Sequence, residues 1–359
     1  MNRQEVIITQ QLEQTLSQAM QHISYDRCFI LTDHTTQRLC LPVVQSFSCL
    51  REAGIISIPA GDINKTLQSV EHVWQELQRQ GATRHSLLVS LGGGMVTDLG
   101  GFAASTFKRG IHLINIPTTL LSMVDASVGG KTGFNFGGLK NEIGVFRDAE
   151  YVILDTIFLR TLDHENLLSG FAEMLKHGLI SDDHHLAQLL QADINDLDAL
   201  RTLLAHSVAI KQRIVDEDPH EQGLRKALNL GHTIGHAFES LSFQTPSLQR
   251  RSQGEASPLL HGYAVAYGLV CELWLSAVKT GFPTDRLHQV SRFINDNYGR
   301  LAITCDHYPA LLELMTHDKK NTGRDINFTL LGGVGDIRIN QTATEEEIKA
   351  ALDFYREGQ

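Results

Sequence analysis

The sequence predicts an α/β N-terminal domain with a mainly parallel sheet, residues 1–160, followed by a mostly α-helical C-terminal domain, residues 161–359. Short apolar runs alternate with helix-like segments up to residue 160, which is the pattern of successive βαβ units. Long stretches of helical period dominate the rest of the chain. The length of 359 residues also exceeds that of one typical domain and favours two.

Each strand of the N-terminal domain is expected where an apolar run ends at a polar or glycine-containing turn, at residues 27–33, 54–60, 85–91, 110–119 and 149–156. Helices are expected between them, at 66–81, where the spacing is amphipathic, and at 95–106. In the C-terminal domain, the helical pattern covers residues 165–180, 184–194, 198–218, 225–241 and 263–281, and a strand pair is expected within 326–339.

Composition narrows the class of protein. Hydrophobic residues make up 42% and charged residues 20% of the chain, as in ordinary globular proteins. The net charge of -10 argues against general binding to nucleic acid, which requires basic residues to neutralise phosphates. The N-terminus has no apolar signal region and the longest apolar run is interrupted by Glu272, so no membrane association is expected. Five scattered cysteines without a C-x-x-C pair indicate reduced thiols and a cytoplasmic protein.

Glycines gather directly after a buried strand in the segment SLGGGMVTDLGGF. Gly93 and Gly94 precede a helix, so their backbone N–H groups suit a pyrophosphate, although a simple tight turn would use the same residues. The pattern departs from G-x-G-x-x-G because Thr97 occupies the position of the last glycine. Asp98 either reaches a ribose or serves as an ordinary charge near the helix N-terminus. Nucleotide binding is the favoured interpretation.

A second glycine-rich segment, SVGGKTGFN, is not a phosphate-binding P-loop, because Asp125 stands where the first glycine is required. Lys131 nevertheless lies in a glycine-flanked loop. Further cationic or amide side chains lie next to glycines in the segments STFKRG and GGLKN, at Lys108, Arg109, Lys140 and Asn141. Such groups suit a phosphate or carboxylate ligand, although solvated surface residues would give the same pattern.

Ionisable side chains interrupt three apolar segments of the C-terminal domain. His232 and His236 are four residues apart, Glu173 precedes Lys176 by three, and His261 opens a buried-looking helix. A glutamate with two histidines is a common catalytic zinc set. A single buried histidine is usually a core residue. Ionisable groups in three apolar segments are harder to explain in this way, because an unpaired buried charge costs free energy, and they favour a shared functional site. The residues alone do not decide which histidines bind, and His177 is a further candidate.

Seven motifs occur in the order found in the sugar-phosphate cyclase family: GGGMVTDLGGF, FKRGIHLINIPTTLLSMVDASVGGKTG, GLKN, GFAEMLKHG, GLRKALNLGHTIGHA, LLHGYAVAYG and HDKKNTG. The chain resembles this family from about Asp33 to the C-terminal strands, and most closely the branch that makes 3-dehydroquinate. It departs from the usual pattern at Asp62, where glutamate is common, and at residues 147–149 and 163–166.

The resemblance implies a Rossmann-like domain that binds NAD and a helical domain that binds zinc or cobalt. The metal ligands would be Glu173, His232 and His261, while His236 would contact substrate instead. The NAD contacts would be Asp33, Asp62, Lys65, Gly93, Gly94, Asp98, Thr118, Thr119, Asp125, Lys140, Phe158 and Thr161. The substrate contacts would be Asp125, Lys131, Asn141, Lys176, Lys211, Arg225, Asn229, His236 and Lys320. Family members are dimers in which the residue matching Arg109 reaches the neighbouring subunit's phosphate.

The activity implied is conversion of 3-deoxy-D-arabino-heptulosonate 7-phosphate to 3-dehydroquinate, by transient oxidation with NAD, loss of phosphate, return of the hydride and ring closure. A competing interpretation is a related cyclase that acts on sedoheptulose 7-phosphate or glucose 6-phosphate. These sugars lack a carboxylate, so Arg225 and Asn229 favour the first substrate. Two further candidates are a metal-dependent alcohol dehydrogenase of the glycerol dehydrogenase kind and a catalytically inactive NAD-binding protein.

Overall fold

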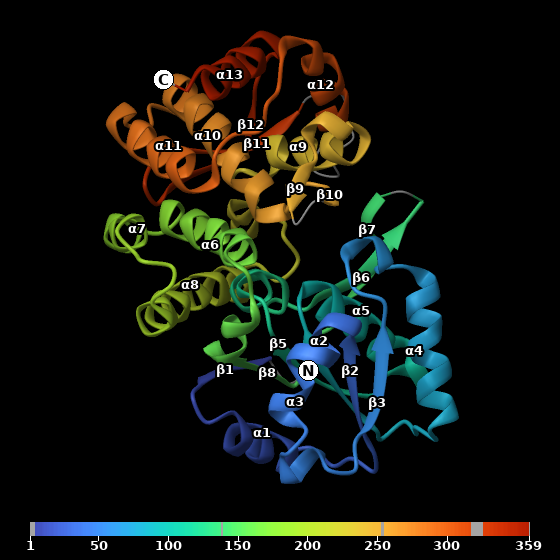
Figure 1. Ribbon diagram of the computed structural model, residues 1–359. Helices are drawn as coiled ribbons and strands as arrows, with labels where there is room; N and C mark the ends of the chain where they lie inside the picture. Colours follow the sequence, from blue (N-terminus) through green and yellow to red (C-terminus); the bar gives the residue numbers. More distant parts are fainter. Residues whose placement is uncertain (1–3, 138, 253–254, 317–325, 359) are drawn as a thin grey trace. The chain divides into compact units, whose positions relative to one another are not determined.

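The computed structural model describes residues 4–358 apart from 138, 253–254 and 317–325. The chain divides into two compact units, Met1–Leu167 and Leu168–Gln359. The first unit is α/β and the second is mostly helical (Figure 1). This confirms the predicted fold class.

A parallel sheet of six described strands forms the centre of the first unit (Figure 1). Its order is β1-β8-β5-β4-β2-β3, and the strands are β1 (Glu5–Thr9), β2 (Cys28–Asp33), β3 (Gly54–Ile58), β4 (Leu87–Gly92), β5 (His112–Pro117) and β8 (Tyr151–Asp155). Every residue of β4 is buried, as expected for a central strand that is covered on both faces. The sequence predicts all of these strands except β1.

The helices of the first unit are α1 (Leu12–Gln21), α2 (His34–Leu39), α3 (Leu41–Val44), α4 (Leu67–Arg79) and α5 (Gly94–Thr106). Two glycines allow α5 to pack very closely: a Cβ atom at Gly100 would lie 2.3 Å from Oγ of Ser90 in β4, and one at Gly101 would lie 2.4 Å from Cγ2 of Thr132. Thr132 belongs to an antiparallel hairpin, β6 (Lys131–Phe136) and β7 (Leu139–Phe146), which the sequence pattern does not predict. Most of β7 is exposed, and its sequence therefore lacks the continuous apolar run by which a buried strand is predicted.

The second unit consists mainly of helices. They are α6 (His164–Leu179), which begins in the last residues of the first unit, α7 (Asp183–Leu190), α8 (Leu197–Glu217), α9 (His232–Gln244), α10 (His261–Thr280), α11 (Thr284–Tyr298), α12 (Tyr308–Thr316) and α13 (Glu345–Glu357). Two hairpins accompany them, β9 (Arg250–Ser252) with β10 (Glu255–Ser257), and β11 (Asn327–Gly333) with β12 (Asp336–Thr342). The second hairpin confirms the predicted strand pair.

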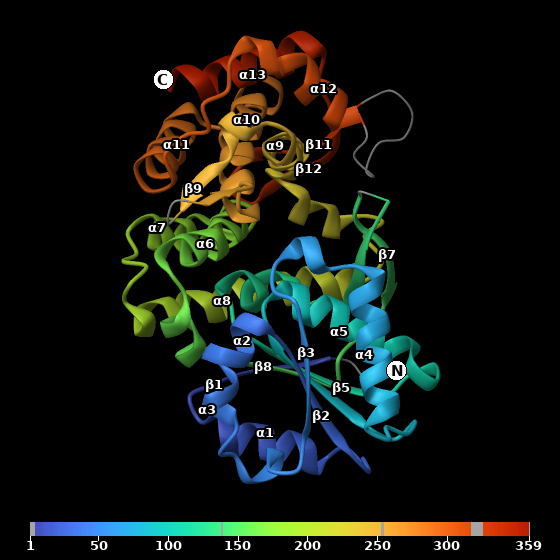
Figure 2. The ribbon, with the colours of Figure 1, turned by 45° about the vertical axis from the view of Figure 1, so that its right-hand side comes forward.

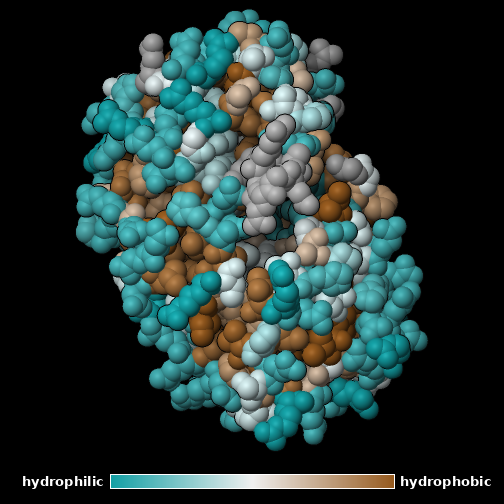
Figure 3. Space-filling view, viewed as in Figure 1, coloured by the Kyte–Doolittle hydropathy of each residue, from teal (hydrophilic) through white to brown (hydrophobic). Residues whose placement is uncertain are grey.

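Helix α10 lies beside α9 and α13, and β11 packs against it (Figure 2). Most of its residues are buried, which explains the long apolar run in the sequence. Helices α11 and α13 are amphipathic instead: their outer faces are hydrophilic (Figure 3), while Val290 and Leu352 are wholly buried. Among the described residues, no helix is both long enough and apolar enough to span a bilayer.

One predicted helix is divided in the structure. The segment expected to be helical over 225–241 contains a short 3-10 helix, η6 (Leu224–Asn229), and then α9 from His232. Gly231 separates them in a left-handed conformation with φ of +79°, and a Cβ atom there would lie 2.8 Å from the side chain of Leu269. The expectation of one continuous helix over 225–241 is therefore wrong.

Candidate metal centre and cofactor-binding residues

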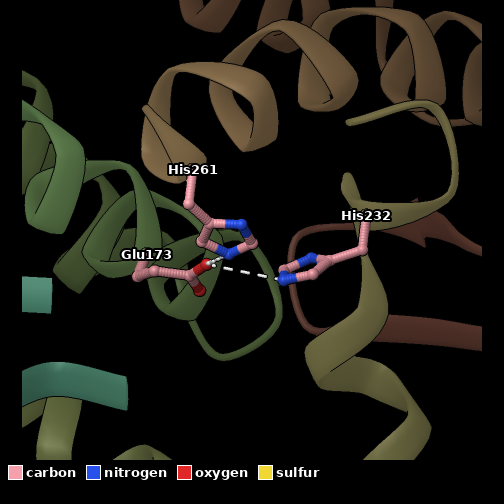
Figure 4. A group of neighbouring side chains, drawn as sticks. All are labelled: Glu173, His232 and His261. Atoms are coloured by element: carbon pink, nitrogen blue, oxygen red, sulfur yellow. Dashed lines mark ion pairs between the residues drawn. The ribbon is translucent and has the colours of Figure 1, made fainter. Parts of the chain in front are cut away.

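Three side chains converge in the second unit: Glu173 from α6, His232 at the start of α9 and His261 at the start of α10 (Figure 4). One ligand atom from each lies within 4.8 Å of the others. Nε2 of His232 is 3.5 Å and Nε2 of His261 is 3.4 Å from Oε1 of Glu173. The three residues are far apart in the sequence, so the packing of the helices assembles the group.

The start of α10 is seated directly against α6. The backbone N–H of Gly262 donates to Oγ of Ser169, 3.1 Å away, and a Cβ atom at Gly262 would lie 1.8 Å from the Ser169 carbonyl oxygen. Ser169 precedes Glu173 by four residues, so both occupy one face of α6. The contact therefore places His261 next to Glu173.

The start of α9 is held by a carboxylate from α10. Glu272 is fully buried and accepts hydrogen bonds from the backbone N–H groups of Gly231, at 2.7 Å, and Ile234, at 3.1 Å. A helix N-terminus has unpaired N–H groups and a partial positive charge, so a carboxylate is well placed there. Glu272 therefore fixes the helix end that carries His232.

The electrostatics of the group keep the carboxylate charged. Burial favours the neutral form of Glu173, but its ion pair with Lys176 and the two histidines outweigh this and hold its pKa well below the usual value. Burial, and then Lys176, lower the pKa of His232 well below its usual range. Burial also works against a charge on His261, but its contacts with Glu173 and Glu239 dominate and raise its pKa to about 10. An ion that bound here would displace the proton from His261.

The donor set fits a catalytic zinc or cobalt ion, for which one carboxylate and two imidazoles are common ligands. The second ring nitrogen of each imidazole has an acceptor nearby. Nδ1 of His232 lies 3.1 Å from the carbonyl oxygen of Leu230, and Nδ1 of His261 lies 3.4 Å from Oε2 of Glu239. Such contacts commonly orient metal ligands and leave Nε2 for the ion. The ring of His236 lies next to this group, 5.2 Å from that of His232 between ring centres.

The other expected substrate contacts of the second unit are buried cations and an amide. Lys176 and Lys211 are both buried, and Lys176 pairs with Glu173. Arg225 is also buried and donates to the carbonyl oxygen of Pro219, 2.7 Å away. Asn229 donates to Oε1 of Glu221, a residue that the sequence pattern does not single out, at 2.8 Å. Lys320 lies outside the residues that the structure describes.

Glu221 has an unusual backbone conformation with φ of +58°. Its loop is organised by Asp218, whose carboxylate accepts from the N–H groups of Gln222, Gly223 and Arg225. A strained non-glycine residue that contacts a candidate site residue is a candidate itself. Nothing in the sequence around Glu221 signals either the strain or the contact.

In the first unit, expected NAD contacts follow the carboxyl ends of parallel strands, which share one edge of the sheet. These residues are Asp33 in β2, Asp62 and Lys65 after β3, Gly93 and Gly94 after β4, Thr118 and Thr119 after β5, and Phe158 and Thr161 after β8. Ligands of open α/β sheets bind at this edge. A Cβ atom at Gly93 would lie 3.1 Å from Cγ2 of Thr119, so this turn passes close to the end of the next strand.

Charged pairs connect several of these positions. Nζ of Lys65 lies 2.5 Å from both Oδ2 of Asp98 and Oδ1 of Asn141. Nζ of Lys140 lies 3.1 Å from Oδ2 of Asp62. Residues expected to contact NAD thus lie next to Asn141, which is expected to contact substrate.

The remaining expected residues of this unit lie in a loop, in a π-helical turn and at the start of a strand. Lys108 and Arg109 have φ of 49° and 71° and are followed by Gly110 at 116°, so the loop that presents Arg109 is left-handed throughout. Asp125 lies in a single turn of π-helix, η4 (Ser122–Ala126), a form frequent at functional sites. Lys131 is exposed at the start of β6.

Comparison with known proteins identifies relatives along almost the whole chain. The family model described as 3-dehydroquinate synthase N-terminal matches residues 55–169, and that described as 3-dehydroquinate synthase C-terminal matches residues 170–321. A 3-dehydroquinate synthase of Parabacteroides distasonis is 53% identical over 359 residues, which is 99% of each chain.

Solved structures share the fold. A 2-epi-5-epi-valiolone synthase of Streptomyces hygroscopicus with NAD+ and Zn2+ bound matches with a TM-score of 0.80 at 25% identity, over 99% of this chain and 98% of that one. A 2-deoxy-scyllo-inosose synthase complexed with carbaglucose-6-phosphate, NAD+ and Co2+ matches with a TM-score of 0.80 at 21% identity, over 99% and 96% of the two chains. At this identity the second likeness concerns the fold alone.

Proposed function

The chain belongs to the 3-dehydroquinate synthase family, and from this we propose that it is a carbon–oxygen lyase that converts 3-deoxy-D-arabino-heptulosonate 7-phosphate to 3-dehydroquinate and phosphate. This reaction belongs to the shikimate pathway of aromatic amino-acid biosynthesis. The observation that carries the proposal is the convergence of Glu173, His232 and His261 in a chain with this relative. NAD and zinc or cobalt are its cofactors.

The proposed metal ligands are Glu173, His232 and His261, through one carboxylate oxygen and two Nε2 atoms. These residues would hold the metal ion, which would supply polarisation of a substrate hydroxyl, and bound NAD would supply the hydride acceptor. The ammonium of Lys176, paired with Glu173, keeps that carboxylate ionised at neutral pH and therefore ready to bind a cation.

We propose that NAD is held at the carboxyl edge of the sheet. The turn after β4 offers the N–H groups at the start of α5, and Gly93 and Gly94 have no side chains that would keep a pyrophosphate from these groups. The further proposed contacts are those expected from the sequence: Asp33, Asp62, Lys65, Asp98, Thr118, Thr119, Asp125, Lys140, Phe158 and Thr161. Lys65 supports this assignment because it joins Asp98 to Asn141.

The proposed substrate contacts supply charges that match the substrate. The planar guanidinium of Arg225 suits two carboxylate oxygens, and lysine ammoniums suit phosphate oxygens and the charge that develops as phosphate leaves. These contacts are Arg109, Asp125, Lys131, Asn141, Lys176, Lys211, Arg225, Asn229, His236 and Lys320. His236 supports the set because its ring lies beside the metal group without joining it.

Assembly and location complete the proposal. We propose a homodimer, because the family resemblance assigns Arg109 to a phosphate in the neighbouring subunit and its left-handed loop presents it at a fixed point. We propose a cytoplasmic protein, because none of the five cysteines forms a disulfide. We also propose that the sequence divides into two functional domains near residue 160, of which the first binds NAD and the second binds the metal.

The competing functions are not favoured. Both family models are of 3-dehydroquinate synthases, and the relative at 53% identity has that name, whereas the valiolone synthase is only 25% identical. An alcohol dehydrogenase would not need a buried arginine and lysines for a carboxylate and a phosphate.

The test is phosphate release from 3-deoxy-D-arabino-heptulosonate 7-phosphate with catalytic NAD and zinc, measured beside sedoheptulose 7-phosphate. We expect stoichiometric phosphate and dehydroquinate from the first substrate without net NADH. Glu173→Ala serves as the control and should lose metal and activity together. Release from sedoheptulose 7-phosphate alone would contradict the proposal.

A further inference from the structure

The two histidines of the metal group are oriented by different kinds of acceptor. His232 contacts a backbone carbonyl, that of Leu230, whereas His261 contacts a side-chain carboxylate, that of Glu239. The position of a backbone carbonyl is set by the fold, but a carboxylate can be removed by substitution. Glu239 is therefore the residue through which the orientation of one ligand can be changed without altering any ligand.

Glu239 lies on α9, seven residues after His232 and three after His236, so all three share one face of the helix. Its side chain is only 5% exposed, and its Oε2 faces Nδ1 of His261 at 3.4 Å. A buried carboxylate costs free energy unless it is paired or hydrogen-bonded. The N–H of the His261 ring supplies such a partner.

The backbone around His261 is held by groups other than the Glu239 carboxylate. Ser242 donates to the Glu239 carbonyl oxygen, at 2.7 Å, and accepts from the N–H of Leu259, at 3.0 Å. On the other side of His261, the N–H of Gly262 donates to Ser169. Removing the carboxylate therefore leaves these backbone contacts around His261 in place and frees the rotation of the His261 ring.

We propose that Glu239 is a positioning residue for the metal: its carboxylate accepts the Nδ1–H of His261 and fixes the tautomer and the ring orientation in which Nε2 faces Glu173 (Figure 4). The inference rests on the metal site proposed above. Loss of a partner of this kind lowers metal affinity by about 10–100-fold. The role is separate from turnover and is measurable in the absence of substrate.

The experiment compares Glu239→Gln and Glu239→Ala with the wild-type full chain. Zinc dissociation constants are measured by competition with a chromophoric chelator, and the visible absorption of the cobalt-loaded proteins reports ligand geometry. We expect a loss of zinc affinity of about 10–100-fold and an altered cobalt spectrum for Glu239→Ala. Glu239→Gln keeps an acceptor oxygen and almost the same volume, so its loss should be smaller, about 3–10-fold.

The matched control is Glu347→Gln, which removes a half-buried carboxylate of the same unit that pairs with Lys279. It should bind zinc within about twofold of the wild type. Wild-type affinity and an unchanged cobalt spectrum in Glu239→Ala would overturn the inference, as would equal losses in Glu239→Gln and Glu347→Gln. If Glu239→Ala does not fold, Glu239→Gln decides alone. A wild-type protein that bound neither ion would instead refute the metal site itself, and the inference with it.

Discussion

Replacing Gly262 by alanine tests how the start of α10 is seated against α6. A Cβ atom at this position would lie 1.8 Å from the carbonyl oxygen, 2.4 Å from the carbonyl carbon and 2.5 Å from the Cα of Ser169. All three are backbone atoms, so no side-chain rotation can relieve the overlap. Non-bonded heavy atoms prefer separations of about 3.5 Å, and the helices must therefore move apart locally by more than about 1 Å.

Overpacking of this kind costs about 1–3 kcal/mol, and the upper end applies because backbone must move. A loss of about 3 kcal/mol lowers the melting temperature of a unit of this size by roughly 6–12 °C. Because His261 precedes Gly262, the displacement should also weaken zinc binding. The assay is differential scanning calorimetry of the full chain, combined with zinc titration.

The control is Gly281→Ala at the end of the same helix. Gly281 has φ of +82° and no atom within 4 Å of a Cβ, so only backbone strain of about 1 kcal/mol is expected, with unchanged zinc affinity. If Gly262→Ala melts within about 2 °C of the wild type and binds zinc equally well, the reasoning from this contact is refuted.

Three further predictions concern other side chains of the second unit. Glu272→Ala removes the acceptor of two buried N–H groups at the start of α9 and should lower the free energy of unfolding by about 2–4 kcal/mol, measured by urea denaturation; a change below about 0.5 kcal/mol would contradict the capping role. Burial, and then His206, lower the pKa of His185 to about 4. The stability that the neutral form of His185 contributes is present above pH 6.5 and is lost as the pH falls toward 4, by about 2 kcal/mol between pH 7 and pH 5. His185→Gln should remove this part of the pH dependence of the free energy of unfolding. A variant with the same pH profile as the wild type would refute the prediction. His236→Ala should retain zinc, since His236 is outside the metal group of described residues, but lower kcat by about 100-fold; loss of zinc would show that both histidines of the i, i+4 pair bind the ion.

The sequence predicts the parallel sheet well because its central strands are continuous apolar runs. Strand β4 is buried at every residue. Its run of leucine and valine, followed directly by glycines, indicates a buried strand that ends in a turn. Strand β1 escaped prediction because a single short run at the N-terminus gives no repeating pattern. The β6–β7 hairpin escaped because most of β7 is exposed and its sequence mixes glycine with charged residues.

The candidate site could be predicted only in part, because the residues that support its ligands are far from their partners in the sequence. Ligand types such as Glu173 and His232 are visible as ionisable residues in apolar segments, and the family resemblance selects among them. The residues that support them are not visible: Glu239 and Glu272 are ordinary helical glutamates in the sequence, and only the packing of α9 against α10 gives each its partner. From the sequence alone, Glu272 is merely an interruption of an apolar run.

The pairing of β1 has a consequence for the order in which the chain folds during its synthesis. Residues Glu5–Thr9 pair in register with Tyr151–Asp155, so β1 is the neighbour of β8, which follows the other described strands of the sheet in the sequence. A ribosome that adds about 5–20 residues per second completes this partner many seconds after β1 has emerged. Until then β1 has no place in the sheet, and the edge of β5 that β8 will cover stays open. We therefore expect nascent chains that end before residue 150 to be sensitive to proteases and prone to associate, whereas chains released just after β8 should acquire protease resistance in one step.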